Sequence, residues 1–309
     1  MSKRWKIMGL GEVLWDCFGE TRKPGGAPSN AAFQCNQLGA EGIVCSRVGT
    51  DPLGDELFGL FQRLGMRTDA IQKDVQKPTG TVTVHMNANS SATYTIHTGV
   101  AWDFLEYTPA LQTIAQTLDA VCFGSLAQRS DTTRHTIFQL LKDVPQTCLK
   151  VYDVNLRQEY YSLEILENSM RVADIVKLND EEAVVVADLL GFPIRERGVV
   201  DFCFELGVKY DLKKVCVTRG PEGCLLVQCG KTREECAVAD VPGEVVPVAD
   251  TVGSGDAFTA ALVYTTLEGF PLEIQARFAN AVGTLVATRP GGMPPLVPEL
   301  SELKARFLR

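Results

Sequence analysis

The sequence predicts an α/β fold in which a doubly wound, mostly parallel sheet is flanked by helices. Short apolar runs alternate with helical patterns from about residue 120 to residue 288, as in chains that build a parallel sheet from strand–helix–strand units. Polar residues follow several of these runs, at the strand ends where open α/β sheets bind their ligands. Two segments, residues 80–86 and 92–98, instead alternate with period two, which indicates an exposed hairpin outside the parallel core.

The composition is that of a soluble globular protein, and it excludes several functions. The 309 residues carry a formal net charge of −8, so no basic face is available for nucleic acid. The apolar run that ends at Leu10 is too short for a signal peptide or a membrane span. Ten cysteines occur without a C-x-x-C pair or zinc-like spacing to the three histidines, which indicates reduced thiols. We therefore expect a cytoplasmic protein with neither a nucleic-acid nor a membrane partner.

The N-terminal segment predicts a buried strand at residues 6–10 and a second strand within residues 12–18. A dinucleotide-binding G-x-G-x-x-G is excluded because Leu14 stands where its last glycine is required. The next residues, Pro24–Gly26, predict a turn. Ser29 is expected to cap a helix that runs through Phe33 and Leu38 to Gly39.

The remaining elements follow the same two patterns. Further strands are predicted at residues 43–48, 120–123, 150–154, 175–178, 214–218, 224–227 and 234–238, and helices at 51–65, 131–141, 163–172 and 272–288. The last two strands are expected to form an antiparallel edge around Gly230–Thr232. This G-K-T is not a P-loop, because Leu225 occupies the position of the required glycine.

The stretch Asp250–Phe258, D-T-V-G-S-G-D-A-F, combines an anion cradle with a carboxylate. Gly253 and Gly255 flank Ser254 where an apolar helical pattern begins, so backbone N–H groups can converge on a phosphate at a helix N-terminus. Asp256 lies in the first turn, where a carboxylate can accept the proton of an alcohol that attacks phosphorus. A capping aspartate after a simple turn explains the same residues, so the rest of the chain must decide.

Two segments resemble the signatures of the PfkB, or ribokinase-like, family of sugar and nucleoside kinases. Residues 250–258 resemble its second signature, and Gly25–Ala32, G-G-A-P-S-N-A-A, resembles its first, sugar-binding signature. The two occur in the family's order and span nearly the whole chain. The resemblance implies one ribokinase-like kinase domain over residues 1–309, with a small β-sheet lid contributed by about residues 12–24 and 80–98.

The resemblance also assigns the residues of phosphoryl transfer and sugar binding. It makes Asp256 the general base, the amides of Gly253–Gly255 the anion hole, and Arg157 of a D-x-N-x-R segment a partner for the transferred group; an ion pair with a nearby carboxylate would equally explain Arg157. The implied sugar contacts are Asp16, Gly25, Gly26, Asn30, Trp102 and Asp103. For Asp16 the alternative is an exposed strand end, and for Trp102 it is simple burial.

The implied nucleotide and metal sites use other strand ends. The contacts to ATP are Asn179, Thr218, Gly220, Gly223 and Asn280, and the N-x-x-E pair Asn179 and Glu182 organises Mg²⁺ through water, although such residues also begin ordinary helices. The potassium site of many relatives corresponds to Asp250, Val252, Arg289 and Gly291, mainly through backbone atoms. Pro290 and Pro295 depart from common versions of that turn.

The acceptor sugar is predicted from the same resemblance. The segments around Glu12–Asp16, Gly25–Ala32 and Val100–Asp103 look more like fructokinases than ribokinases, so we expect D-fructose to be phosphorylated at its 6-hydroxyl. Ribose, 2-keto-3-deoxygluconate and a nucleoside remain open, as does a relative that binds ligands without catalysis. Exposed edges of the lid would also allow a homodimer.

Overall fold

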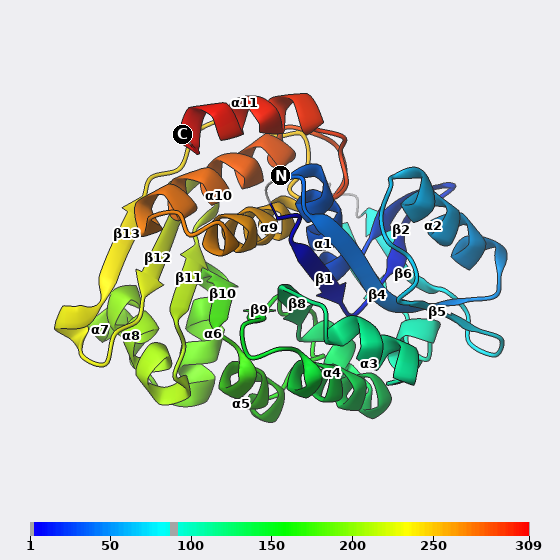
Figure 1. Ribbon diagram of the computed structural model, residues 1–309, viewed down its shortest axis with the longest axis horizontal. Coiled ribbons are helices and arrows are strands. Elements are labelled where there is room, and N and C mark those ends of the chain that lie inside the picture. Colours follow the sequence, from blue (N-terminus) through cyan, green and yellow to red (C-terminus); the bar gives the residue numbers. More distant parts are fainter. Residues whose placement is uncertain (1–2, 87–91, 309) are drawn as a thin grey trace.

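The computed structural model describes residues 3–86 and 92–308, and two β-sheets organise them (Figure 1). In the described residues the larger sheet has nine strands, in the order β13-β12-β11-β10-β9-β8-β1-β4-β5. Their bounds are β1 (Lys6–Leu10), β4 (Glu41–Gly49), β5 (Ile71–Asp74), β8 (Ala120–Gly124), β9 (Leu149–Asp153), β10 (Ile175–Asn179), β11 (Lys214–Thr218), β12 (Cys224–Gln228) and β13 (Ala237–Val241). Pairing is parallel from β5 to β11 and antiparallel for β12 and β13, which confirms the predicted mostly parallel sheet.

Helices cover both faces of this sheet, because alternate strand residues point to opposite sides. On β1, Met8 and Leu10 pack into one core cluster and Ile7 into the other. The layer on the Ile7 side contains α1 (Ala27–Gln37), α9 (Ser254–Leu267), α10 (Leu272–Ala287) and α11 (Val297–Phe307). The opposite layer contains α3 (Pro109–Ala115), α4 (Asp131–Asp143), α5 (Leu163–Val172), α6 (Asp180–Leu190) and α8 (Val199–Tyr210). Figure 1 shows these two layers above and below the strands, and the doubly wound prediction is confirmed.

Two further helices complete the described fold. Helix α2 (Pro52–Arg63) packs its Leu57 and Phe61 against the Val44 side of β4, and its N-terminus is capped by Asp51, whose carboxylate accepts from the Gly54 amide. The short α7 (Ile194–Arg197) leads directly into α8. Neither α3, α7, α8 nor α11 was among the predicted helices.

The second sheet, which we call the lid sheet, is separate from the first. It consists of β2 (Leu14–Phe18), β3 (Thr21–Gly25), β6 (Gly80–Met86) and β7 (Ala92–Ile96), in the order β3-β2-β6-β7. Pro24 lies on the edge strand β3, where an N–H group is not needed on the outer side. The prediction of a turn at Pro24–Gly26 was therefore wrong for Pro24 and Gly25, which belong to β3. The predicted hairpin turn at residues 87–91 lies outside the described residues.

Helix α1 begins at Ala27, so the prediction that Ser29 caps it was wrong. Gly26 is the N-cap, with a φ of 109°, and a Cβ atom there would lie 2.4 Å from the carbonyl oxygen of Glu12. Only glycine fits this backbone position. The Ser29 hydroxyl instead donates to the carbonyls of Gly25 (3.1 Å) and Gly26 (2.8 Å).

The antiparallel edge of the large sheet begins later than predicted. Arg233–Glu235 forms a short 3₁₀ turn, so β13 starts at Ala237 rather than near Glu234. Gly230–Thr232 lies in the connection between β12 and β13, as expected for a turn without a phosphate role.

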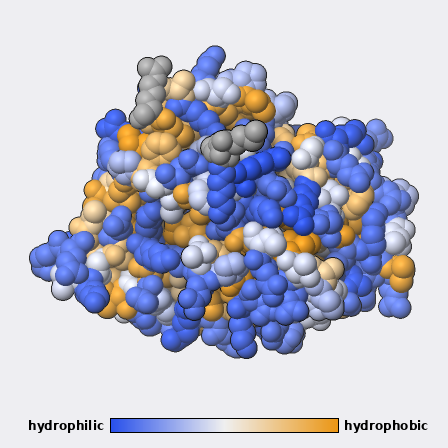
Figure 2. Space-filling model, in the orientation of Figure 1, coloured by the Kyte–Doolittle hydropathy of each residue, from blue (hydrophilic) through white to orange (hydrophobic). Residues whose placement is uncertain are grey.

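Most cysteines lie in a well-packed core. All ten cysteines are free and seven are buried; burial raises the pKa of Cys35 to about 12, so such thiols are poor nucleophiles. No helix in the described residues has the length and hydrophobicity to cross a membrane. The face in Figure 2 is largely hydrophilic, with hydrophobic residues in small groups between polar ones.

Candidate active site

A cavity of about 1090 Å³ opens at the carboxyl ends of the central strands. Strand β1 lies between β8 and β4, so the order of strands reverses beside it, and ligands of open α/β sheets bind at such a reversal. The cavity wall includes Asp16 of the lid sheet at one end, Thr218 of β11 at the other, and Asp256 of α9 between them.

Most of the predicted site residues line this one cavity. They are Asp16, Gly26, Asn30, Arg157, Asn179, Glu182, Thr218, Gly220, Gly223, Asp250, Val252, Gly253, Ser254, Gly255, Asp256 and Asn280. Five predicted residues, Gly25, Trp102, Asp103, Arg289 and Gly291, do not belong to its lining.

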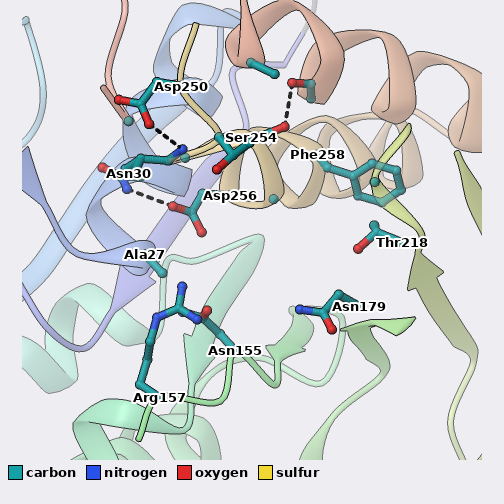
Figure 3. Close-up of a pocket in the computed structure, with 18 of the residues that line it drawn as sticks. Ala27, Asn30, Asn155, Arg157, Asn179, Thr218, Asp250, Ser254, Asp256 and Phe258 are labelled. Carbon is teal, nitrogen blue, oxygen red and sulfur yellow. Dashed lines mark hydrogen bonds between the residues drawn. The ribbon is translucent and has the colours of Figure 1, made fainter. Parts of the chain in front are cut away.

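Asp256 projects from the first turn of α9 into the cavity (Figure 3). The side-chain amide of Asn30 donates to its Oδ2 at 2.7 Å, so the two family signatures meet in one hydrogen bond. Desolvation and the negative charge of Asp153 raise the pKa of Asp256 to about 6, against the opposing effects of Asn30, Lys177 and Arg157. The carboxylate is therefore ionised near neutral pH and can accept a proton.

Backbone amides at the start of α9 are available to an anion. Within the described part of the chain, the N–H groups of Gly253 and Gly255 have no protein acceptor, whereas the Ser254 N–H already donates to the Thr251 carbonyl at 3.2 Å. The Ser254 hydroxyl donates to the Gly283 carbonyl of α10 at 2.7 Å (Figure 3). Of the three amides predicted to form the cradle, those of Gly253 and Gly255 are thus free, and Ser254 anchors the turn through its own N–H and hydroxyl.

Glycine is required in this cradle for two different reasons. Gly253 has a φ of 79°, and a Cβ atom on it would lie 2.4 Å from the Cα of Gly292, so both strain and crowding exclude other residues. A Cβ atom on Gly255 would lie 3.1 Å from the Nζ of Lys177. The absent side chain at position 255 therefore leaves this ammonium close to the anion site.

Lys177 is a site residue that the sequence analysis missed. It lies on β10 on the same side as Ile175, which faces α9, and its side chain is buried. Its Nζ contacts both carboxylate oxygens of Asp153 at 3.0 and 3.1 Å, and Thr259 of α9 donates to the same carboxylate at 2.8 Å. Burial alone would lower the pKa of Lys177, but Asp153, Glu182 and Asp256 hold it above its ordinary value. A cation is thus fixed beneath the cradle.

The lid end of the cavity carries two more carboxyl groups. Glu12, also missed, accepts from the Ala27 N–H at 3.2 Å, and burial raises the pKa of Glu12 to about 7. Burial likewise raises the pKa of Asp16 to about 6. A Cβ atom on Gly25 would lie 2.4 Å from Asp16 Oδ2, so Gly25 makes room for this carboxylate rather than lining the cavity itself. Such acceptors suit the hydroxyl groups of a polyol.

Arg157 lies on an irregular loop after β9. Asn155 and Gln158 in this loop have positive φ values of 41° and 49°, which non-glycine residues rarely adopt and which cluster at functional sites. The Arg157 guanidinium donates only to the Leu156 carbonyl, at 3.1 Å, and no ion pair to it occurs among the described residues. Figure 3 shows its side chain extending toward the region of Asp256, where its charge is available to a ligand.

Asn179 and Glu182 form a capping box at the start of α6. Each side chain accepts the other's backbone N–H at 2.8 Å, and Glu182 also accepts from the Leu156 N–H at 2.9 Å. Burial raises the pKa of Glu182. The helix-start interpretation is therefore correct, and both residues also belong to the lining of the cavity.

This donor set fits a Mg²⁺ ion held largely by water. No cluster of three or more His, Cys, Asp or Glu side chains suitable for a metal occurs among residues 3–86 and 92–308. Mg²⁺ keeps several waters and needs only one or two protein carboxylates beside substrate phosphates. Asn179 and Glu182 are the residues that would hold it.

The end of the cavity at which the ATP contacts were predicted is formed by turns and by α10. Gly223 has a φ of 93°, and a Cβ atom on it would lie 2.0 Å from the Val241 carbonyl oxygen. The Thr218 hydroxyl donates to the Leu178 carbonyl at 3.3 Å, and Asn280 reaches from α10 to the Pro242 carbonyl at 3.4 Å. These contacts leave a shallow surface of backbone and small side chains along the predicted ATP site.

Trp102 and Asp103 lie away from the cavity, contrary to their predicted sugar contacts. Their exposed fractions are only 1% and 4%. Arg129 forms an ion pair with Asp103 at 2.8 Å and stacks its guanidinium 3.9 Å from the centre of the Trp102 ring. The Asp103 carboxylate also accepts from the Gly99 N–H at 2.8 Å. These residues fix the connection between the lid sheet and the core.

Comparison with known proteins decides the family. The family model for pfkB carbohydrate kinases matches residues 7–300. The chain therefore belongs to the pfkB family. A protein of Pyrococcus horikoshii described as an uncharacterized sugar kinase is 32% identical over 278 residues, which cover 87% of this chain and 82% of the relative. Its structure in complex with ATP superposes with a TM-score of 0.81 at 29% identity, covering 98% of this chain and all of that one.

Fructokinases of the pfkB family are also similar over their full length. The fructokinase of Klebsiella pneumoniae is 27% identical over 309 residues, covering 94% of this chain and 96% of the relative. A fructokinase double mutant of Vibrio cholerae, solved with fructose, ADP and potassium, shares the fold with a TM-score of 0.81 at 22% identity and covers all of both chains. The prediction of an ATP-dependent carbohydrate kinase is confirmed.

Proposed function

We propose that this kinase transfers the γ-phosphoryl group of ATP to a primary hydroxyl of a sugar, D-fructose giving fructose 6-phosphate. The observation that carries the proposal is the position of Asp256 beside the free amides of Gly253 and Gly255. A proton acceptor and an anion cradle on one helix turn match what phosphoryl transfer to an alcohol requires.

The reaction follows from these positions. Asn30 holds Oδ2 of Asp256 at 2.7 Å, which leaves the other carboxylate oxygen to accept the proton of the attacking hydroxyl. The new bond joins the sugar oxygen to the γ-phosphorus, the bond from phosphorus to the β–γ bridging oxygen breaks, and ADP leaves with that electron pair. The amides of Gly253 and Gly255, with the charges of Lys177 and Arg157, stabilise the transferring group. Mg²⁺, when bound near Asn179 and Glu182, offsets phosphate charge.

The lid end supports a neutral sugar as the first choice. Asp16 and Glu12 offer acceptors to hydroxyl groups, and a carboxylated substrate would face both of them. The full-length similarity to fructokinases points the same way. Arg157, whose charge has no ion-pair partner in the described chain, favours an acidic sugar such as 2-keto-3-deoxygluconate as the second candidate. Ribose is the third candidate for the acceptor.

The test is an assay of ADP release with MgATP across fructose, ribose, 2-keto-3-deoxygluconate, glucose and adenosine. We expect fructose to give the highest kcat/KM, and the Asp16→Asn variant to raise KM for fructose by about 10-fold or more with little change in kcat, because the lost contact binds substrate in the ground state. A preference for another acceptor would replace fructose and keep the mechanism. Silence on all five, in protein that binds ATP, would support a noncatalytic relative.

Pairing of two copies through the lid sheet is a separate proposal. Strands β3 and β7 form its edges, and Tyr94 on β7 is 52% exposed. A second lid would cover such edges. Light scattering on the purified protein tests it, and a monomeric mass at micromolar concentration would reject it.

A further inference from the structure

The carboxylate expected at the potassium site already has a cation. Asp250 Oδ2 lies 3.1 Å from the Nζ of Lys23, a residue of lid strand β3. The same oxygen accepts from the Gly291 N–H at 2.9 Å, and Oδ1 accepts from the Val252 N–H at 3.1 Å. Three donors, one of them an ammonium, therefore occupy this carboxylate. Although burial opposes it, these contacts hold the pKa of Asp250 below its usual value.

The stem of Lys23 also crosses the second loop of that site. Gly291 has a φ of 82°, and a Cβ atom on it would lie 3.4 Å from Cδ of Lys23. Lys23 thus runs over Gly291 and ends at Asp250, between the two loops from which the potassium ligands were predicted. Arg289 turns elsewhere: its guanidinium contacts Thr288 at 2.8 Å and Glu299 at 3.2 Å.

These residues do not fit a bound potassium ion. The predicted potassium ligands are mainly backbone oxygen atoms, and the carboxylate of Asp250 is the one negative charge among those four residues. Here that charge is already neutralised by a lysine ammonium, and a second cation on the same carboxylate would meet electrostatic repulsion from it. The predicted potassium site and the structure therefore disagree, and the residue responsible is Lys23, to which the sequence analysis gave no role.

We propose that Lys23 supplies the positive charge that potassium supplies in a cation-activated kinase, so that the activity of this enzyme is independent of monovalent cations. The inference rests on the proposed kinase function. Asp250 precedes the cradle by three residues, and its contacts to Val252 and Gly291 join the loop before α9 to the loop after α10. The charge of Lys23 offsets that of Asp250, so Asp250 can keep its contacts to both loops. Those contacts in turn fix the position of the Gly253 amide. The ammonium comes from the lid sheet, so the charge is internal to the chain.

The first experiment compares rates in KCl, NaCl and choline chloride at one ionic strength, with MgATP and the preferred acceptor. We expect wild-type rates in the three salts to agree within about 2-fold. In Lys23→Met, which keeps an apolar stem but loses the charge, we expect the rate in choline to fall by about 10-fold and to recover with increasing KCl, since coupling between two sites of a protein is commonly of this size. A wild-type enzyme activated 5-fold or more by KCl would overturn the proposal, as would a Lys23→Met enzyme that KCl does not rescue.

Arg22→Met is the matched control. Arg22 is the neighbouring cation on β3, but its side chain pairs with Glu56 rather than with Asp250. Its loss should create no dependence on KCl. A dependence equal to that of Lys23→Met would show that lid charge in general, not the Lys23–Asp250 pair, is responsible, and would also overturn the proposal.

A second readout does not depend on activity. Thermal unfolding of the ADP-bound protein should occur at the same midpoint in KCl and in choline chloride for the wild type, and at a higher midpoint in KCl for Lys23→Met, because an ion that binds only the folded state stabilises it. A wild-type midpoint raised by KCl, or no rise in Lys23→Met, contradicts the proposal. This arm decides even if none of the five acceptors is phosphorylated, so failure of the kinase proposal and failure of the Lys23 proposal are distinguishable.

Discussion

The two ends of the cavity are built differently. The phosphoryl end is built on α9 and β10, where Asp256, Lys177 and the cradle glycines are fixed by contacts from α1, from α9 itself and from strand β9. The end proposed to bind the sugar is formed by the lid sheet, which is separate from the large sheet. The carboxylate of Asp16 at this end accepts no hydrogen bond from the described residues. One end has a fixed geometry before substrate arrives, and the other leaves its polar groups for the substrate.

This difference explains why reaction type and substrate are encoded separately. Charge stabilisation in phosphoryl transfer depends on preorganised groups, so the phosphoryl end tolerates little change. Acceptor choice depends on a few contacts that can be exchanged without disturbing that end. Variants at the phosphoryl end should therefore alter turnover, and variants at the lid end should alter substrate affinity.

The largest effect is expected from Asp256→Asn. An amide cannot accept the proton, so kcat should fall by about 10³-fold, within the range that general bases contribute, while ATP affinity measured by calorimetry stays unchanged. Asp16→Asn is the control at the other end, where KM should change instead. Wild-type turnover of Asp256→Asn would show that Asp256 is not the general base. It would also contradict the expectation that variants at this end alter turnover.

Lys177→Met should be the next most damaging. It leaves the Asp153 carboxylate buried without its cation, and breaking a buried pair costs about 3–5 kcal/mol of stability; loss of the nearby charge should also lower kcat by about 10²-fold. The measurements are chemical unfolding and steady-state rates.

Lys214→Met provides the matched control for that prediction. Lys214 lies on the adjacent strand β11 and is also buried, but its Nζ contacts only neutral oxygens of Gln275 (2.7 Å) and Thr266 (3.1 Å), and burial lowers the pKa of Lys214 to about 8. Its loss should cost about 1–3 kcal/mol and leave kcat unchanged. If Lys177→Met and Lys214→Met changed kcat equally, Lys177 would affect activity only through the stability of the fold.

Much of this site could be predicted from the sequence, because its two ends carry local motifs. Asp256 and Asn30 are 226 residues apart, yet each belongs to a signature whose glycines can be recognised without knowing the fold. The positions of most strands and helices could also be predicted, because apolar runs and helical periods are local properties.

The remaining site residues depend on long-range contacts that no local pattern encodes. Lys177 is one charged residue within the apolar strand Ile175–Asn179, and its importance depends on Asp153 and on α9. Asp103 was predicted to contact sugar because it follows the hairpin, but Arg129, which is 26 residues away, pairs with it instead. Such partner choices are decided by packing, so they could not be predicted from spacing.

The pH dependence separates the two ends again, with a smaller effect. Asp256 must be ionised to accept a proton, so kcat/KM, which reports ionisation of the free enzyme, should fall below a pH of about 6, the value to which its pKa is raised, by about 10-fold for each further pH unit. The stability effect has the opposite sign. Because the folded pKa lies above the ordinary value of 3.8, the folded state binds this proton more tightly, and the resulting stabilisation is present below pH 3.8 and lost as the pH rises through about 6.

Paired unfolding curves of the wild type and Asp256→Asn between pH 4 and pH 8 check that sign. The variant should gain stability relative to the wild type as the pH rises, which is the cost of keeping a charged base in the cavity wall. Glu12 and Asp16 also have raised pKa values and titrate in both proteins, but the charge of Asp256 contributes to the raised pKa of Glu12. The difference between the curves therefore reports Asp256 together with its effect on Glu12. A difference that does not change with pH would contradict the raised pKa.

The smallest catalytic effect is expected from Trp102→Phe. Trp102 is buried beneath the lid connection, where the Thr133 hydroxyl donates to its carbonyl at 2.7 Å and Arg129 stacks on its ring. The smaller ring should lower stability by about 1–3 kcal/mol, as losses of buried volume do, and leave the KM for the sugar within about 2-fold of wild type because no substrate contact is removed. The assay of ADP release measures KM, and thermal unfolding measures the loss of stability. A 10-fold rise in KM with an unchanged kcat would return Trp102 to the sugar site and place the boundary between the two ends further into the core.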